Sequence, residues 1–368
     1  MTTCVLAILS FTVVVVGLSM LLDVAARKLQ NYGLCVIDIN DGEESVEIEG
    51  GATLLSSLGE RKIFIPGACG GQGTCALCKV RVLDGGGPVL PTETPFLSRT
   101  ERLEHVRLSC QVKVKTDMRV RMPAEYLRVQ EYRATVESVT QQTVDIYTIR
   151  MKLVEPAELT FRVGQFIQVK APNPKGGEPV YRAYSISNPD NENNICELVV
   201  RLIPGGICST YLCQTIKPGD EVIFNGPFGE FVLNEDPECE LVCVGGGSGM
   251  APMKSIVFSV LNKQPNRKVW LFFGCRAVKD IFYREMFEEL EAKHPDFKVV
   301  YALSEMDEGD QWDGETGFIH LAVDKMVEDG GRKQAFFCGP PLMSQAATAV
   351  MREKGCKKRD IFFDDFGI

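Results

Sequence analysis

The feature that most constrains the fold of this chain is a glycine-rich loop with three cysteines, followed by a fourth cysteine further along. The loop reads Cys69-Gly-Gly-Gln-Gly-Thr-Cys75-Ala-Leu-Cys78. Because glycine has no Cβ, backbone N–H groups in such a loop can crowd around a small anionic group. Four thiols in this pattern indicate a metal centre, and the fold has to bring Cys110 back toward the loop.

Two kinds of metal centre compete for these thiols. The spacing C-x₅-C-x₂-C is close to that of plant-type ferredoxins, with a longer first gap, as in the adrenodoxin-like variant. A structural zinc site is the alternative, but zinc ribbons usually use two C-x₂-C pairs. Cys110 stands in Leu108-Ser-Cys-Gln-Val and has no such partner. We therefore expect a [2Fe–2S] cluster, which accepts single electrons, on Cys69, Cys75, Cys78 and Cys110.

Length and composition indicate a folded protein with about two or three domains. The chain has 368 residues, of which 45% are hydrophobic and 24% charged. Its net charge of −9 argues against nucleic acid as a partner, because phosphates would be repelled. The remaining cysteines are scattered without the spacing of a disulfide framework, which is typical of a reducing compartment.

The amino terminus has the composition of a membrane-spanning helix. Residues 3–22 carry no charge, and about 20 apolar residues span the hydrocarbon layer. A secretory signal would need a basic leader and a cleavage site, and a buried helix is a further alternative. Arg27 and Lys28 follow the apolar run and favour the cytoplasmic side. We expect residues 1–28 to form a single membrane anchor, with the rest of the chain in the cytoplasm.

Three further domains follow from the patterning. Residues 33–124 alternate as short strands, with a hairpin turn at Asn40-Asp41-Gly42 and a helix over 53–58 ending at Gly59. A strand region over 111–122 is interrupted by a turn at Thr116-Asp117. Residues 130–237 contain many short strands separated by turn residues, which predicts an antiparallel β-barrel. From 238 to 368 strands and helices alternate, which predicts a doubly wound parallel sheet.

A run of glycines marks a candidate nucleotide loop. It lies where a buried strand passes into a helix, so the backbone could approach a pyrophosphate. It departs from G-x-G-x-x-G, and a tight structural turn is an equal alternative. The candidate residues are Gly245, Gly246, Gly247, Ser248, Gly249 and Met250.

Other candidate residues lie on a barrel strand, at a helix start and at the end of a later strand. Arg182 could hold a phosphate, Tyr184 could stack on a flat ring, and Ser185 could hydrogen-bond a ring nitrogen. The alternative is an edge-strand arginine with a core tyrosine. The further candidates are Gly206, Ser209, Cys338, Gly339 and Pro340, and Phe366 in the tail.

Taken in order, these motifs resemble the ferredoxin–NADP reductase superfamily with a ferredoxin domain fused in front. Within it, the chain is similar to the F subunits of Na⁺-translocating NADH:quinone oxidoreductases. This finer likeness rests on the amino-terminal helix, the cysteine loop and the terminal Asp-Asp-Phe-Gly. It rests also on two internal motifs, Gly226-Pro-Phe-Gly-Glu-Phe231 and Thr316-Gly-Phe-Ile-His320. The loop over 172–180 is shorter here than in that family.

The resemblance implies a β-grasp ferredoxin domain, an FAD-binding barrel and an NADH-binding α/β domain. It places NADH against the glycine run, with the nicotinamide near Cys338. It places Ser185 near the reactive flavin nitrogen and Phe366 on the flavin ring. It also implies electron transfer from FAD through the [2Fe–2S] cluster to membrane subunits that reduce quinone and transport Na⁺.

Two other functions fit parts of the pattern. The reductase component of a multicomponent oxygenase has the same three redox modules but is normally soluble. A membrane-tethered zinc-binding scaffold with decayed nucleotide sites would be colourless. The use of NADH rather than NADPH rests on the family likeness.

Overall fold

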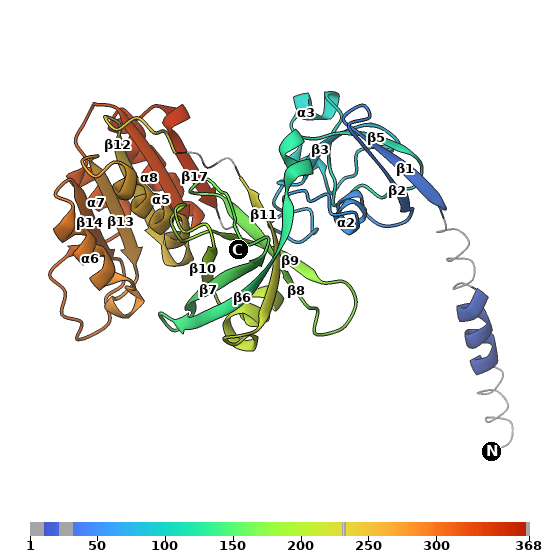
Figure 1. The fold of residues 1–368 in the computed structure, drawn as a ribbon, viewed down its shortest axis with the longest axis horizontal. Helices are drawn as coiled ribbons and strands as arrows, with labels where there is room; N and C mark the ends of the chain where they lie inside the picture. The colour runs from blue at the N-terminus through green and yellow to red at the C-terminus, as the bar shows by residue number, and fades with distance from the viewer. Residues whose placement is uncertain (1–10, 22–31, 230, 232, 366–368) are drawn as a thin grey trace, which may run out of the picture. The chain divides into compact units, whose positions relative to one another are not determined.

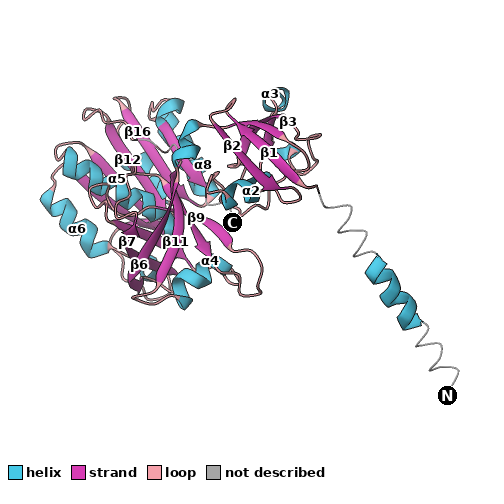
Figure 2. Cartoon of the chain, turned by 45° about the vertical axis from the view of Figure 1, so that its right-hand side comes forward, coloured by secondary structure: helices cyan, strands magenta, loops and turns pink. Residues whose placement is uncertain are grey.

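The computed structural model of the protein describes residues 11–21, 32–229, 231 and 233–365. The chain divides into two compact units (Figures 1 and 2). The first contains residues 1–65 and 71–128, and the second contains residues 66–70 and 129–368. The short stretch 66–70, which includes Cys69, therefore groups with the second unit.

The predicted anchor over residues 1–28 lies largely outside the described residues. Positions 11–21 are helical, with exposed side chains. Within the described ranges no helix is long and apolar enough to cross a membrane.

The first unit is built on a mixed sheet in the order β2-β1-β5-β3-β4. β1 and β2 form the predicted hairpin, and Asn40 and Asp41 at its turn both have positive φ, which these residue types tolerate. Two expectations were wrong in detail. Gly59 lies within α2 rather than ending it, and in the stretch 111–122 the strand β5 covers only Met118–Arg121. The elements are β1 (Leu34–Ile39), β2 (Glu44–Glu49), α2 (Leu54–Glu60), β3 (Lys79–Asp84), η1 (Thr94–Phe96), α3 (Arg99–Leu103), β4 (Val106–Leu108), β5 (Met118–Arg121) and η2 (Ala124–Arg128).

The amino-terminal part of the second unit is the predicted antiparallel sheet, in the order β10-β7-β6-β11-β8-β9. The sheet curls, because Ile186, just beyond β9, forms a bridge to Leu198 on β10. Its inward side chains form one apolar core. The elements are β6 (Gln130–Gln141), β7 (Ile146–Glu155), β8 (Phe166–Ala171), β9 (Val180–Ser185), β10 (Ile195–Arg201), α4 (Ile207–Thr210), η3 (Tyr211–Thr215) and β11 (Glu221–Phe228).

The rest of the second unit is the predicted parallel sheet, in the order β15-β14-β13-β12-β16-β17. Successive side chains of β12 point to opposite faces, as expected for a strand. Cys243 packs with α5 and α6, and Val244 packs with α7 and α8, so helices cover both faces (Figure 1). The elements are β12 (Glu240–Gly246), η4 (Gly247–Gly249), α5 (Met250–Lys263), β13 (Val269–Cys275), η5 (Val278–Asp280), α6 (Arg284–Lys293), β14 (Phe297–Leu303), β15 (Glu315–Thr316), α7 (Ile319–Met326), β16 (Lys333–Gly339), α8 (Pro341–Glu353), η6 (Lys358–Asp360) and β17 (Ile361–Asp365).

A buried ion pair supports the strand that leads to Cys110. Arg107 on β4 donates to the Glu93 carboxylate from Nε at 2.9 Å and from Nη2 at 2.6 Å. The remaining guanidinium donors reach the carbonyls of residues 86–88. Burial alone would raise the pKa of Glu93, but the hydrogen bonds from Arg107 and from backbone N–H groups leave that pKa below its ordinary value.

We predict that Glu93→Gln lowers the free energy of unfolding of the first unit by about 3–5 kcal/mol, because it leaves a buried guanidinium without its counter-charge. Hydrogen exchange of the β3 and β4 amides measures this loss. Glu104→Gln, which removes an exposed partner of Arg81, is the control and should cost less than about 1 kcal/mol. Equal losses in the two variants would contradict the prediction.

The depressed pKa of Glu93 also predicts a pH dependence. The carboxylate contributes stability above the pKa of an unfolded glutamate, about 4.3, and this contribution is lost as the pH falls further. The stability difference between wild type and Glu93→Gln should therefore shrink in acid. A difference that stays constant between neutral pH and pH values well below about 4 would show that the ion pair is not its source.

Candidate functional site

The predicted nucleotide loop lies at a switch point of the parallel sheet. β13 pairs with one side of β12 and β16 with the other, so the connections leave β12 in opposite directions. Ligands of doubly wound folds bind at the carboxyl ends of strands at this point. Gly245 and Cys338 are direct register partners there.

The glycines of this loop are required by close packing. A Cβ on Gly249 would lie 2.0 Å from the carbonyl oxygen of Cys338. Gly247 has a φ of +56°, a conformation that side chains disfavour. The loop then enters α5, whose first N–H groups and dipole favour an anion. Gly246 and Ser248 are half-buried, and Met250 is buried as the first residue of α5.

The predicted residues after β16 meet this loop from the other side. Cys338 is fully buried, so its side chain belongs to the core. Gly339 has a φ of +150°, and Pro340 precedes α8. Phe366 lies outside the described residues. The described chain ends on β17, where residue 365 is the register partner of Gly339.

The structure also brings the flavin candidates together. Arg182, Tyr184 and Ser185 lie on β9, and α4 packs beside this strand, with Cys208 Sγ 3.3 Å from the carbonyl oxygen of Val180. Burial and the neighbouring Cys208 and Cys213 raise the pKa of Tyr184, so its hydroxyl stays protonated.

The remaining flavin candidates have local contacts. Arg182 Nη1 donates to the carbonyl oxygen of Tyr181 at 2.8 Å. Gly206 precedes α4, and the Ser209 hydroxyl is engaged with backbone atoms of Ile203 and Gly206. The hydroxyl of Ser209 thus shapes the loop in front of α4, and the backbone of that loop is the surface left for a phosphate.

The structure brings only some of the predicted cluster cysteines together. Cys78 Sγ and Cys110 Sγ lie 3.3 Å apart and buried in the first unit. Cys75 is half-buried in the same unit, whereas Cys69 belongs to the stretch 66–70. Among the residues that the structure describes, no group of three or more His, Cys, Asp or Glu side chains is arranged as a metal site.

The chemistry of these thiols fits an iron–sulfur group. The hydrogen bond between Cys78 and Cys110, together with burial, raises the pKa of Cys78 above that of an ordinary thiol. A thiolate here therefore needs a compensating cation, which a metal ion supplies. The all-sulfur donor set suits iron–sulfur clusters, and Gly70, Gly71 and Gly73 all have the positive φ that a loop around such a group requires.

Two features were missed by the sequence analysis. The guanidinium of Arg201, at the end of β10, lies against Gly247, and its Nε is 3.3 Å from a carboxylate oxygen of Asp145. Lys254 on α5 forms a buried ion pair with Glu197 on β10. Each of these two contacts joins elements far apart in the sequence. The only sequence signal for such a contact would have been a basic residue close to a glycine run.

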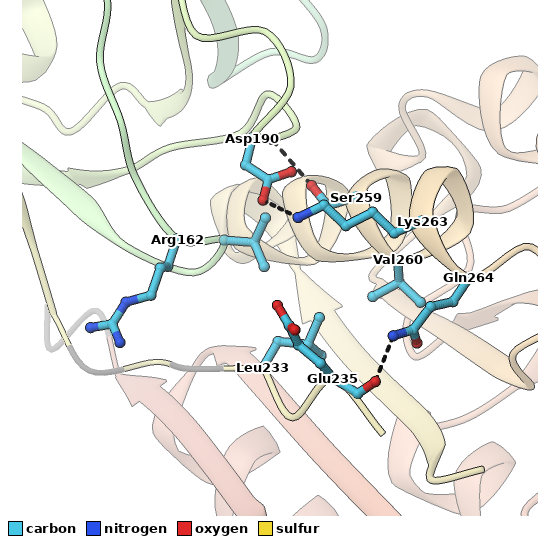
Figure 3. A pocket seen from close by; sticks show the side chains of 9 residues that line it. Arg162, Asp190, Leu233, Glu235, Ser259, Val260, Lys263 and Gln264 are labelled. Atoms are coloured by element: carbon cyan, nitrogen blue, oxygen red, sulfur yellow. Dashed lines mark hydrogen bonds and ion pairs between the residues drawn. The ribbon is translucent and has the colours of Figure 1, made fainter. Parts of the chain in front are cut away.

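A cavity of about 360 Å³ lies elsewhere in the second unit (Figure 3). It is lined by the carboxyl-terminal end of α5 and by loops of the antiparallel sheet, including Arg162, Asp190 and Lys263. The glycine loop is at the opposite end of α5, and none of the predicted site residues lines this cavity.

Family models match most of the chain in the predicted order. They are a 2Fe-2S iron-sulfur cluster binding domain over residues 37–115, an oxidoreductase FAD-binding domain over 133–233 and an oxidoreductase NAD-binding domain over 243–349. These matches confirm the predicted cofactors and identify an oxidoreductase that takes electrons from a nicotinamide nucleotide to FAD and a 2Fe–2S cluster.

Solved structures share this organisation. An Amycolatopsis cytochrome P450 reductase is 30% identical, with a TM-score of 0.71 over 90% of this chain and 98% of its own. A ferredoxin reductase in carbazole 1,9a-dioxygenase is 26% identical, with a TM-score of 0.69 over 90% of this chain and 99% of its own.

Sequence relatives decide between the members of this group. The F subunit of the Na(+)-translocating NADH-quinone reductase of Neisseria gonorrhoeae is 37% identical over 99% of both chains. The protein of the same name in Pseudomonas aeruginosa is 36% identical over 98% of both. These matches favour the predicted main function over an oxygenase reductase or a zinc-binding scaffold. The chain belongs to the family of F subunits of Na⁺-translocating NADH-quinone reductases.

Proposed function

We propose that this chain is the electron-input subunit of a membrane complex that oxidises NADH and reduces quinone, coupled to Na⁺ transport. NADH is the donor and the partner subunits carry the ion path. The proposal is carried by one observation: the glycine loop after β12 and the Cys338 turn after β16 are register partners at the switch point. The relatives' names supply the quinone, the ion and the complex.

The chain's residues have separate roles in this proposal. Backbone N–H groups of residues 245–250 hold the pyrophosphate of NADH, and Arg201 adds a cation beside them. Cys338 and Gly339 border the nicotinamide. Arg182 and the loop from Gly206 to Ser209 hold the FAD pyrophosphate, Tyr184 packs on the flavin, and Ser185 hydrogen-bonds its reactive nitrogen.

Bound FAD supplies the conversion between a two-electron donor and a one-electron acceptor. The acceptor is the [2Fe–2S] cluster on Cys69, Cys75, Cys78 and Cys110. Phe366 covers the flavin ring until the nicotinamide displaces it. This role is supported by β17, which carries the described chain to a position opposite Gly339.

The proposal includes a membrane anchor over residues 1–28, crossing a bacterial inner membrane once with the redox domains in the cytoplasm. It is supported by the uncharged run over 3–22 and by Arg27 and Lys28 after it. A tether of this kind raises the effective concentration of the electron donor near its membrane partners.

We predict that Cys75→Ser abolishes electron flow to one-electron acceptors beyond the cluster but leaves flavin reduction by NADH largely intact. The serine removes one thiolate from the proposed cluster, whereas the proposed FAD and NADH residues are unchanged. Stopped-flow absorbance at the flavin band separates the two steps, and Thr74→Ser in the same loop is the control. Equal loss of both steps in Cys75→Ser would refute the proposed order of carriers.

We predict that Phe366→Ala lowers the apparent KM for NADH by up to about tenfold. A stacked aromatic pair contributes about 0.5–1.5 kcal/mol. Without the Phe366 ring, the nicotinamide no longer has to overcome this free energy to reach the flavin. Steady-state kinetics measure the change. Phe363→Ala, which removes an exposed ring on β17, is the matched control. NADH kinetics that are identical in wild type and Phe366→Ala would show that the tail does not cover the flavin.

A further inference from the structure

One face of α5 is bound to the segment that follows β9 by a row of polar contacts. Ser255 Oγ donates to the carbonyl oxygen of Asn188 at 2.7 Å. Further along the helix, Ser259 Oγ accepts from the N–H of Asp190 at 3.2 Å, and Lys263 Nζ is 2.5 Å from its carboxylate (Figure 3). Positions 255, 259 and 263 are spaced four apart, so they lie on one face.

At the end of this row of contacts nearer the glycine loop, Lys254 forms an ion pair with Glu197. Both side chains are buried, with exposed fractions of 11% and 7%. Ser187 Oγ donates to Glu197 Oε1 at 2.8 Å, and Arg150 Nη1 is 3.4 Å from Oε2. Lys254 Nζ also lies 5.1 Å from the centre of the Tyr283 ring. The carboxylate is thus held by groups of the antiparallel sheet and its following segment on one side, and by helix α5 on the other.

This ion pair joins the two halves of the proposed reaction site through short segments. Lys254 is in the first turns of α5, directly after the glycine loop. Ser187 lies just after Ser185, and its N–H donates to the carbonyl oxygen of Glu197 at 2.8 Å. The N–H of Glu197 donates to Asn188 Oδ1 at 2.9 Å. The path from the flavin strand to the start of α5 therefore runs through residues 187 and 188, which are both hydrogen-bonded to Glu197.

A buried ion pair is a weak source of stability, since apolar residues of similar size often replace it without loss. What the ion pair contributes is a directional contact that only oppositely charged partners can make. Hydride transfer depends steeply on the approach of donor and acceptor, so that a shift of about 1 Å costs about a hundredfold in rate. A contact that sets the distance between the nucleotide loop and the flavin strand therefore affects the rate of hydride transfer.

We propose that the Lys254–Glu197 ion pair is a positioning element that sets the approach of the nicotinamide to the flavin. It acts on the rate of hydride transfer and not on the affinity for NADH. The inference rests on the proposed function, because it takes the glycine loop and β9 as the two halves of the site.

The test uses the full-length protein with its cofactors and the double variant Lys254→Met/Glu197→Leu. Removing both charges avoids an unpaired buried ion, so the variant should keep its FAD and melt close to wild type. Stopped-flow reduction of the flavin should be about 10–100-fold slower at saturating NADH. The dissociation constant for NADH should change by less than about threefold, a split that general damage to the fold would not produce.

Three further variants complete the test. Lys254→Arg keeps the charge and should retain the rate within about threefold. Ser255→Ala removes one contact of the same helix face and should slow flavin reduction by about three- to tenfold. Lys293→Met, which removes an exposed lysine on α6, should match wild type.

Wild-type flavin reduction in the double variant would overturn the proposal, whatever the rate of Ser255→Ala. So would a rate loss in the double variant that tracks a loss of bound FAD or of melting temperature while Ser255→Ala is unchanged. If NADH does not reduce the flavin of the wild-type protein, the proposed function itself is refuted.

Discussion

The backbone of Gly249 passes the carbonyl oxygen of Cys338 so closely that no other residue fits, since a Cβ would lie 2.0 Å from it. This approach lets the turn after β12 lie directly beside the turn after β16. The parallel pairing of Gly245 with Cys338 then defines the switch point, where α5 starts and the sheet presents its carboxyl edge. The proposed nucleotide site and the pairing of β16 with β17 both lie beside this contact.

A second constraint is the separation between the two sheets of the second unit. The proposed nucleotide loop and the proposed flavin strand lie on different sheets, so the proposed function requires their separation to be held. Apolar side chains of the antiparallel sheet, such as Val199, share a buried core with α5. Polar contacts add to this packing: α5 binds the segment after β9 through Ser255 and Ser259, and Lys254 binds Glu197. Directional contacts of this kind add a specific pairing of donor and acceptor to the apolar packing.

Much of the fold could be predicted from the sequence because it follows from local periodicity. The glycine run between β12 and α5, the antiparallel strands and the helices on both faces of the parallel sheet were all expected and found. The stretch 111–115 was misjudged, because alternating apolar residues there are buried without forming a strand apart from an isolated bridge at Lys113. Gly59 was misjudged by one residue, because α2 ends at the exposed Glu60.

The site was predicted less completely, for a physical reason. Motifs reveal residues that act as one local group, such as those on β9 or in the cysteine loop. Arg201 at Gly247 and Lys254 at Glu197 are contacts between segments distant in sequence, so no spacing rule reports them. The anchor and Phe366 fall on residues outside the described ranges and stay predictions.

The central claim is that reducing equivalents enter at the carboxyl-terminal sheet as a pair and leave singly through thiolate-bound iron. Metal and sulfide analysis of anaerobically purified protein, followed by low-temperature paramagnetic resonance after adding NADH, tests it most directly. The account predicts iron and acid-labile sulfide in equal amounts and the signal of a reduced [2Fe–2S] cluster. Protein with bound flavin but neither iron nor sulfide would contradict it.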